Sequence, residues 1–163
     1  MTMKNEISIR PATAADAAAL SEMICANAKT TLLPHYSREQ WQIFLNYYSP
    51  EAMHAKIEKQ HIFCAWFDGK IVGTVALENA FVYGFYTRLE YRNMGIGQFM
   101  MQHLERFAIA IGISSIELAA SPEGLSFYLA NGWEKVKDIT IEHGGVGFQE
   151  TLMVKHLESQ RKR

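Results

Sequence analysis

Residues 92–111 read RNMGIGQFMMQHLERFAIAI, and this stretch decides the fold. After the two glycines, apolar residues recur at three- and four-residue steps, which predicts a helix with one buried face that ends at Gly112. Gly95 and Gly97 stand where this helix begins. Glycines let a ligand approach the backbone, and the free N–H groups and positive dipole end of a helix start favour an anion. The stretch therefore predicts a phosphate-binding turn, beside which Arg92 adds a positive charge.

The rest of the chain predicts strands and helices in one continuous order. Alternating polar and apolar residues, Asp-Gly and Asn-Gly pairs, prolines and capping residues mark their limits. We expect strands at about 7–10, 62–67, 70–77, 81–87, 115–120, 133–141 and 146–154, and helices at about 14–27, from 37, from 50, 96–111 and 122–130. This order predicts an α/β (α+β) fold in which helices cover a mixed sheet.

Length and composition limit the class of protein. The chain has 163 residues, of which 48% are hydrophobic, so we expect a single domain with a core at about 3–157 and a polar tail at 158–163. A net charge of -1 argues against nucleic acid as a partner. No apolar run approaches the roughly 20 residues that span a membrane. Cys25 and Cys64 fit buried thiols, so a reducing cytoplasm is the expected location.

The glycine turn does not fit the two common nucleotide-binding motifs. A dinucleotide fold needs a third glycine where Met100 stands, and a P-loop needs Gly-Lys-Ser/Thr. The turn instead resembles that of the GNAT acyltransferase superfamily, whose pattern Arg92, Gly95 and Gly97 fill. The resemblance extends upstream to residues 84–87, at the family's fourth strand, and downstream to a Tyr-x-x-x-Gly-aromatic signature at 128–133.

This resemblance implies a mostly antiparallel sheet whose fourth and fifth strands splay apart, with acetyl-CoA bound between them and no metal. The fourth strand and the turn would hold the pantetheine arm, the thioester and the pyrophosphate. The implied cofactor-binding residues are Phe85, Tyr86, Thr87, Arg92, Asn93, Met94, Gly95, Ile96, Gly97, Gln98, Ser121 and Tyr128. Ser121 stands where many relatives have Asn, which weakens one side-chain contact to pantetheine.

Tyr128 aligns with the family's acid tyrosine, which would protonate the departing thiolate; the alternative is one more core aromatic. No carboxylate stands at the family's base position, because that position is Phe81. Glu78 and Glu117 are the nearest carboxylates along the sheet and could act through water, although a solvated sheet glutamate is the better interpretation of each. His35 and His143 are weaker candidates.

The acceptor side is less defined. Residues 32–41 resemble a helix region that walls the acceptor site in one bacterial branch of the family. His35, Tyr36 and Trp41 would form that wall, while core packing explains the aromatic residues equally well.

These inferences predict a cytoplasmic N-acetyltransferase that moves an acetyl group from acetyl-CoA to the primary amine of a small molecule, by direct attack of the amine on the thioester. A protein or peptide amine is the second acceptor class. A non-catalytic acyl-CoA-binding regulator and an interaction protein without a ligand remain alternatives. The partners expected are the amine and, in an assembly, a second copy of the chain as a homodimer, with neither nucleic acid nor membrane.

Overall fold

The computed structural model describes residues 6–158. The expected domain start near Met3 and residues 159–163 of the expected polar tail lie outside these residues. The strands are β1 Ser8–Pro11, β2 His61–Phe67, β3 Lys70–Glu78, β4 Phe81–Thr87, β5 Ser115–Ala120, β6 Glu134–His143 and β7 Val146–His156. The helices are α1 Ala17–Thr31, α2 Arg38–Tyr47, α3 Pro50–Lys59, α4 Ile96–Ala110 and α5 Leu125–Ala130, with short 3-10 turns η2 Ala14–Asp16, η3 Leu33–His35 and η4 Leu89–Tyr91.

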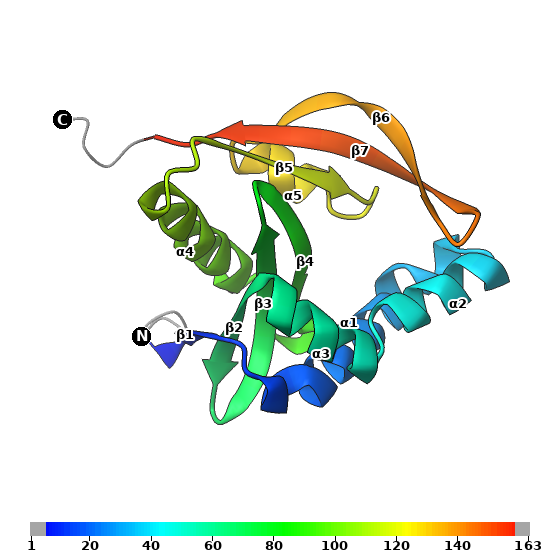
Figure 1. The fold of residues 1–163 in the computed structure, drawn as a ribbon, viewed down its shortest axis with the longest axis horizontal. Coiled ribbons are helices and arrows are strands. Elements are labelled where there is room, and N and C mark those ends of the chain that lie inside the picture. The colour runs from blue at the N-terminus through cyan, green and yellow to red at the C-terminus, as the bar shows by residue number, and fades with distance from the viewer. Residues whose placement is uncertain (1–5, 159–163) are drawn as a thin grey trace.

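The strands form one sheet in the order β1-β2-β3-β4-β5-β7-β6 (Figure 1). Each neighbouring pair is antiparallel except β4 and β5, which are parallel. The predicted mixed, mostly antiparallel sheet is confirmed. The parallel pair lies at the centre of the sheet, and the long β6–β7 hairpin extends from it over α2 (Figure 1).

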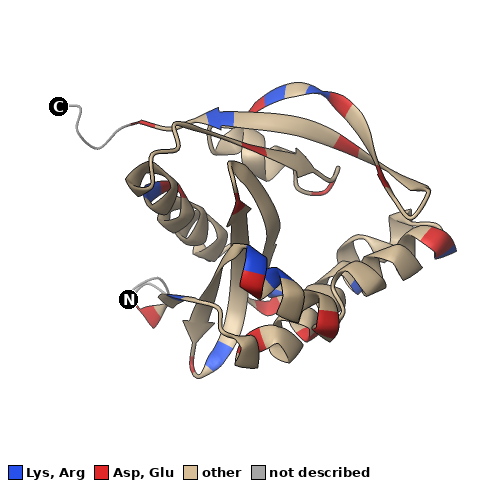
Figure 2. Ribbon diagram, in the orientation of Figure 1, with Lys and Arg blue, Asp and Glu red and all other residues tan. Residues whose placement is uncertain are grey.

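Helices cover both faces of the sheet, because the central strands are apolar on both sides. Phe63 and Ala65 of β2 belong to the core that packs against α4, whereas Ile62 and Cys64 belong to the core that packs against α1 and α3. This alternation follows the two-residue period of a strand. Charged residues lie mainly on the helices and the β6–β7 hairpin, and the central strands are almost free of them (Figure 2).

Several boundaries follow from local signals in the sequence. Ser37 caps α2: its Oγ accepts from the Gln40 backbone N–H at 3.0 Å, and the Gln40 Oε1 accepts from the Ser37 N–H at 2.8 Å. Pro50 is the first residue of α3. Asp68 and Gly69 form the tight β2–β3 turn at φ 53° and 78°. These predicted features are confirmed.

Two predicted helix limits are wrong. α1 continues past Asn27 to Thr31, because no breaker occurs before Pro34. The helix expected from Pro122 begins only at Leu125. The Gly124 N–H donates to the Ser121 carbonyl at 3.1 Å, so residues 121–124 form a turn in which proline occupies the second position. Helix geometry is therefore delayed by one turn.

Candidate active site

The two parallel strands at the centre of the sheet pair at one end only. Phe81 and Glu117 are in register, and the Glu117 N–H donates to the Ala80 carbonyl at 2.9 Å. Beyond this point no residue of β4 pairs with β5, and Figure 1 shows the two strands diverging. The ends of these strands, Phe85–Thr87 and Ala119–Ala120, therefore leave main-chain groups unpaired by the sheet. We call this region the splay.

A bulge lies in β4 at the start of the splay. Tyr83 pairs with Ala76 and Tyr86 with Thr74, so Gly84 and Phe85 together oppose the single residue between these partners. Gly84 has φ 57°, a conformation that favours glycine. A bulge of this kind redirects side chains and backbone groups. Phe85 packs on the α4 side of the sheet, and Tyr86 packs among residues of the α1 side.

The predicted phosphate turn directly precedes α4. Gly95 caps the helix with φ 83°, and no side chain accepts a hydrogen bond from the first turn. The first helical hydrogen bond joins the Phe99 N–H to the Gly95 carbonyl at 3.0 Å, so the N–H groups before it have no partner within the helix. Asn93, at φ 64°, and Met94 are exposed in the turn. This arrangement suits an anion.

Gly97 shows why the turn needs glycine. A Cβ built on Gly97 would lie 3.2 Å from the Phe85 ring, 3.4 Å from Thr87 Oγ1 and 3.7 Å from the Phe127 ring. These three side chains come from β4 and α5 and surround the helix start. Because Gly97 has no side chain, its backbone stays accessible between these neighbours. The backbone N–H groups of the helix start can then donate hydrogen bonds to a pyrophosphate.

Other predicted contacts are partly occupied by the protein itself. The Asn27 Nδ2 donates to the Thr87 carbonyl, which fixes the end of β4 to α1. The Gln98 side chain donates to Asn131 Oδ1 at 3.0 Å, and Asn131 Nδ2 donates to the Phe127 carbonyl at 2.8 Å. The side chain of Gln98 therefore joins α4 to α5, and its backbone N–H remains the group that faces the turn.

Tyr128 lies beside the splay in α5 and is buried, with 9% of its surface exposed. Its ring centroid is 5.9 Å from that of Phe85 and 5.8 Å from that of Trp133. Burial, with a smaller effect from the negative charge of Glu150, raises the pKa of Tyr128 well above its ordinary value. The phenol therefore keeps its proton at neutral pH and is available as a donor.

The acceptor-side residues predicted from the sequence lie on η3 and α2. Tyr36 packs edge-on against Phe148 of β7 at 5.4 Å between ring centroids, and Trp41 stacks on Phe44 at 5.6 Å. His35 is exposed, and its Nε2 lies 3.3 Å from Glu123 Oε2 in the turn after β5. Tyr36 therefore packs against β7, Trp41 packs along α2, and His35 lies beside the turn after β5.

Five tyrosines lie between α2 and the splay: Tyr36, Tyr47, Tyr48, Tyr86 and Tyr128. We call them the tyrosine cluster. The rings of Tyr48 and Tyr86 meet edge-on with their centroids 5.8 Å apart. Burial raises the pKa of each of these five residues, to about 12 for Tyr36. The cluster is therefore a wall of neutral phenols.

Glu150 of β7 faces this cluster, and the sequence analysis missed it. After burial, its negative charge is among the causes that raise the pKa values of Tyr36, Tyr47, Tyr48 and Tyr128, so it lies near all four. Burial raises the pKa of Glu150 itself from 4.5 to about 7. The signal that could have found it is a carboxylate two residues from Phe148, on the inward face of a strand.

Of the two carboxylates named from the sequence, Glu78 lies near Tyr47, whose pKa its negative charge helps to raise, whereas Glu117 is not among the charges that act on the tyrosine cluster. Glu78 ends β3, where its Oε1 accepts from Gln60 Nε2 at 3.0 Å and its Oε2 lies 4.0 Å from Lys59 Nζ. Glu117 is exposed on β5 at the paired end of the splay. Neither residue is among the charges that act on Tyr128. The structure therefore does not bring them together with the candidate acid.

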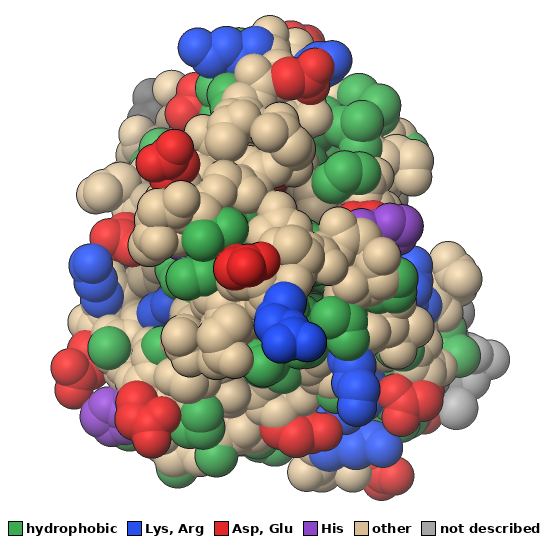
Figure 3. All heavy atoms as spheres, turned by 90° about the vertical axis from the view of Figure 1, so that its right-hand side faces the viewer, with side chains coloured by type: hydrophobic (Ala, Val, Ile, Leu, Met, Phe, Trp, Pro, Cys, Tyr) green, Lys and Arg blue, Asp and Glu red, His purple; other side chains and the backbone are tan. Residues whose placement is uncertain are grey.

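Within residues 6–158 no three His, Cys, Asp or Glu side chains gather as a metal site. In the same range, no helix has the length and apolar character needed to cross a bilayer. Figure 3 faces α2 and the hairpin end, and on this surface acidic and basic side chains are interspersed without a large area of one sign.

A model of the family described as acetyltransferase (GNAT) domain matches residues 32–155, which is most of the chain. The protein therefore belongs to the GNAT acetyltransferase family. The match includes β4, the glycine turn, Tyr128 and Glu150. A comparison with curated proteins gave no match.

Solved structures share the fold at low sequence identity. A GCN5-related N-acetyltransferase from Rhodopseudomonas palustris superposes with a TM-score of 0.86 at 23% identity, covering 96% of this chain and 99% of that one. The PaiA N-acetyltransferase from Thermoplasma acidophilum, solved in complex with coenzyme A, gives 0.77 at 22% identity, covering 92% and 98%. The apo form of YjaB from Escherichia coli gives 0.71 at 15%, covering 93% and 99%.

Proposed function

We propose that the protein transfers an acetyl group from acetyl-CoA to the primary amine of a small molecule. The observation that carries this proposal is the convergence of three features at one place: the splay, the glycine turn at the start of α4, and the buried phenol of Tyr128. Family membership supports acyl transfer, and the coenzyme A complex of the Thermoplasma relative supports the donor.

The glycine turn would bind the pyrophosphate of the donor. Backbone N–H groups at Ile96, Gly97 and Gln98 and the dipole of α4 provide the donors. Arg92, exposed at the entry of the turn, adds a charge. A Cβ at Gly97 would lie 3.2 Å from the Phe85 ring and 3.4 Å from Thr87 Oγ1, so a larger side chain there would crowd these two neighbours. This part of the site binds the donor and supplies no chemistry.

The splay would hold the pantetheine arm as an additional strand beside β4. Backbone groups on the edge of β4 that faces β5, at Phe85 and the Thr87 N–H, are available for it on one side, because Asn27 occupies the Thr87 carbonyl, and Ser121 follows β5 on the other. At the bulge, main-chain N–H groups can also polarise the thioester carbonyl, which accumulates negative charge as the amine attacks. No metal is needed for this step.

Tyr128 would protonate the sulfur when CoA leaves. Its neutral phenol lies behind Phe85, in contact with the strand that holds the thioester. General acid catalysis of this kind contributes typically about 10²- to 10⁴-fold to the rate. A regulator that only binds acyl-CoA has no use for such a group, so Tyr128 favours the enzyme over the binding module.

The experiment is a screen of small amines and short peptides for release of CoA thiol from acetyl-CoA, with calorimetric titration of acetyl-CoA alone as its companion. The proposal predicts binding together with amine-dependent thiol release. Binding without release by any amine would favour the regulator. No binding at millimolar ligand would overturn both CoA-based interpretations, and preferential turnover of peptides would replace the small-molecule acceptor.

A further inference from the structure

Glu150 lies at the open end of the splay. Thr151 pairs with Ala120, the last residue of β5, so Glu150 is the first residue of β7 beyond that pairing. It shares a strand face with Phe148, whose ring meets Tyr36 at 5.4 Å. The carboxylate is therefore directed toward the tyrosine cluster.

The Glu150 carboxylate has no partner of its own in the described part of the chain: it makes neither a hydrogen bond nor an ion pair with residues 6–158. Half-buried carboxylates normally have such partners, because desolvation of the ionised form is costly. The other glutamates near the site differ in this respect. Glu123 pairs with His35, and Glu78 accepts from Gln60.

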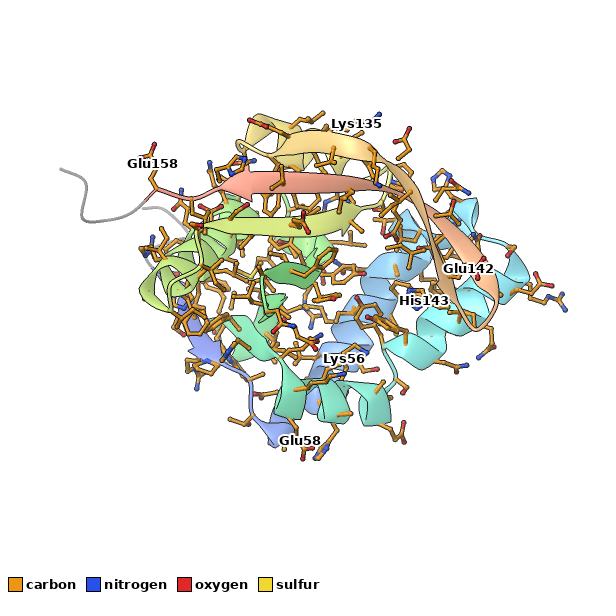
Figure 4. All side chains as sticks on the ribbon, turned by 45° about the horizontal axis from the view of Figure 1, so that its top comes forward. Lys56, Glu58, Lys135, Glu142, His143 and Glu158 are labelled. Carbon is orange, nitrogen blue, oxygen red and sulfur yellow. The ribbon has the colours of Figure 1, made fainter. Side chains whose placement is uncertain are left out.

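The groups that face Glu150 are largely neutral. Tyr36 follows η3, Tyr47 and Tyr48 lie at the end of α2, and Tyr128 lies in α5; all four have raised pKa values. On β6, His143 contacts Tyr47 and Phe148 at 5.1 and 5.7 Å between ring centroids. The other charged residues of β6 are exposed: Glu134, Lys135, Lys137, Asp138 and Glu142. Figure 4 shows His143 beside α2 at the hairpin end, with Glu142 next to it.

The cluster already binds one ammonium group of the protein. Lys56 of α3 places its Nζ 3.7 Å from the Tyr47 ring centroid and donates to the Tyr47 carbonyl at 2.7 Å. Electron-rich rings attract a cation, and a small amine is an ammonium ion at neutral pH. The aromatic wall together with one unpartnered carboxylate is therefore complementary to a cation with an apolar body.

We propose that Glu150 binds the ammonium group of the acceptor and accepts its proton. This inference rests on the proposed function and adds to it the base and the acceptor class: a small primary amine with an apolar or aromatic body and no carboxylate of its own. A carboxylate beside the amine would lie close to the charge of Glu150 and be repelled.

The proton balance is complete with the groups present. Glu150 takes one proton from the ammonium ion, and the freed nitrogen lone pair forms the C–N bond to the thioester carbonyl carbon. The C–S bond breaks, and its electron pair leaves on the sulfur, which receives the Tyr128 proton. The nitrogen loses a second proton, which restores the phenol through solvent, and Glu150 releases the first to solvent. The products are the amide, CoA thiol and one proton.

The test compares Glu150→Gln with Glu142→Gln, a matched change at an exposed carboxylate of the same hairpin. The assay is kcat/KM for 2-phenylethylamine across pH, or for the best amine of the screen. In wild type and Glu142→Gln, kcat/KM should rise with pH near pH 7 as Glu150 ionises. This rise should be separate from the change caused by deprotonation of the free amine at higher pH. Glu150→Gln should lose the rise near pH 7 and about 10²- to 10⁴-fold in kcat/KM while acetyl-CoA affinity is unchanged.

Two further measurements complete the test. Glu150→Asp keeps a carboxylate, so its kcat/KM should still rise with pH, at a lower overall rate. A residue with a purely structural role would not make this rise depend on the presence of a carboxylate. Phenylalanine should be acetylated far more slowly than 2-phenylethylamine. Wild-type rates and an unchanged rise with pH in Glu150→Gln, or equal use of the two amines, would overturn the inference and leave the transferase intact. Absence of turnover by wild type with every amine would instead overturn the proposed function itself.

Discussion

The ionised form of Glu150 should destabilise the folded protein, and this effect can be measured without any substrate. Burial raises the pKa of its carboxyl from 4.5 to about 7. At about 1.4 kcal/mol per pKa unit, this difference corresponds to about 3 kcal/mol. Solvent reaches part of the half-buried side chain, so we expect about 2 kcal/mol.

The sign follows from proton binding. Between the two pKa values, the folded state binds more protons at Glu150 than the unfolded state does. Stability from this residue is therefore full below the unfolded pKa of 4.5 and falls as pH rises through about 7. Glutamine cannot ionise, so the unfolding free energy of Glu150→Gln should increase relative to that of wild type as pH rises from about 4.5 to about 7.

The assay is urea unfolding of wild type, Glu150→Gln and the control Glu142→Gln at about pH 5 and about pH 8, with the unfolding free energy extrapolated to water. Glu150→Gln should exceed wild type by about 2 kcal/mol more at the higher pH than at the lower. The control should track wild type at both. A difference between Glu150→Gln and wild type that does not change with pH would refute the burial of this carboxyl as described.

Three further substitutions test other parts of the structure. Tyr128→Phe should leave the acetyl-CoA dissociation constant unchanged and lower kcat by about 10²- to 10⁴-fold. This loss should be smaller with an acyl donor whose thiol is more acidic. If the variant has the kcat of wild type under conditions where chemistry limits the rate, Tyr128 has only a packing role. Gly97→Glu should fold, by circular dichroism, and lose calorimetric binding of acetyl-CoA, because its side chain meets Phe85 and adds negative charge at the phosphate position; unchanged affinity would contradict the phosphate site. Ser37→Ala removes the α2 cap and should cost about 1 kcal/mol in urea unfolding, whereas no change would show that the cap is replaced by water.

The parts of the fold that the sequence predicted are those determined by neighbouring residues. The capping box of Ser37 and Gln40, the Asp68-Gly69 turn and the glycines before α4 each act within a few positions of the chain. The resemblance to the family then supplied the sheet and the splay. The shorter α5 escaped prediction because Pro122 suits both a helix start and the second position of a turn.

The acceptor side could not be predicted in the same way, because it is assembled from distant segments. Tyr36 and Glu150 are brought together only when β7 pairs beyond β5 and the hairpin packs on α2, where Gln40 Nε2 donates to the Gly147 carbonyl at 2.9 Å. Glu78 and Glu117 lie near Phe81 along the neighbouring strands β3 and β5, which is why the sequence indicates them as bases. In the structure Glu78 accepts from Gln60 and Glu117 is exposed.

The most direct test of the central claim follows the acetyl group itself. Acetyl-CoA labelled in the acetyl carbons is incubated with the protein and the best amine from the screen, and the amine is analysed by mass spectrometry against a reaction without protein. The proposed function predicts that the label appears on the amine nitrogen in amounts equal to the CoA thiol released. Thiol release without labelled amide, or label found equally in the reaction without protein, would contradict it.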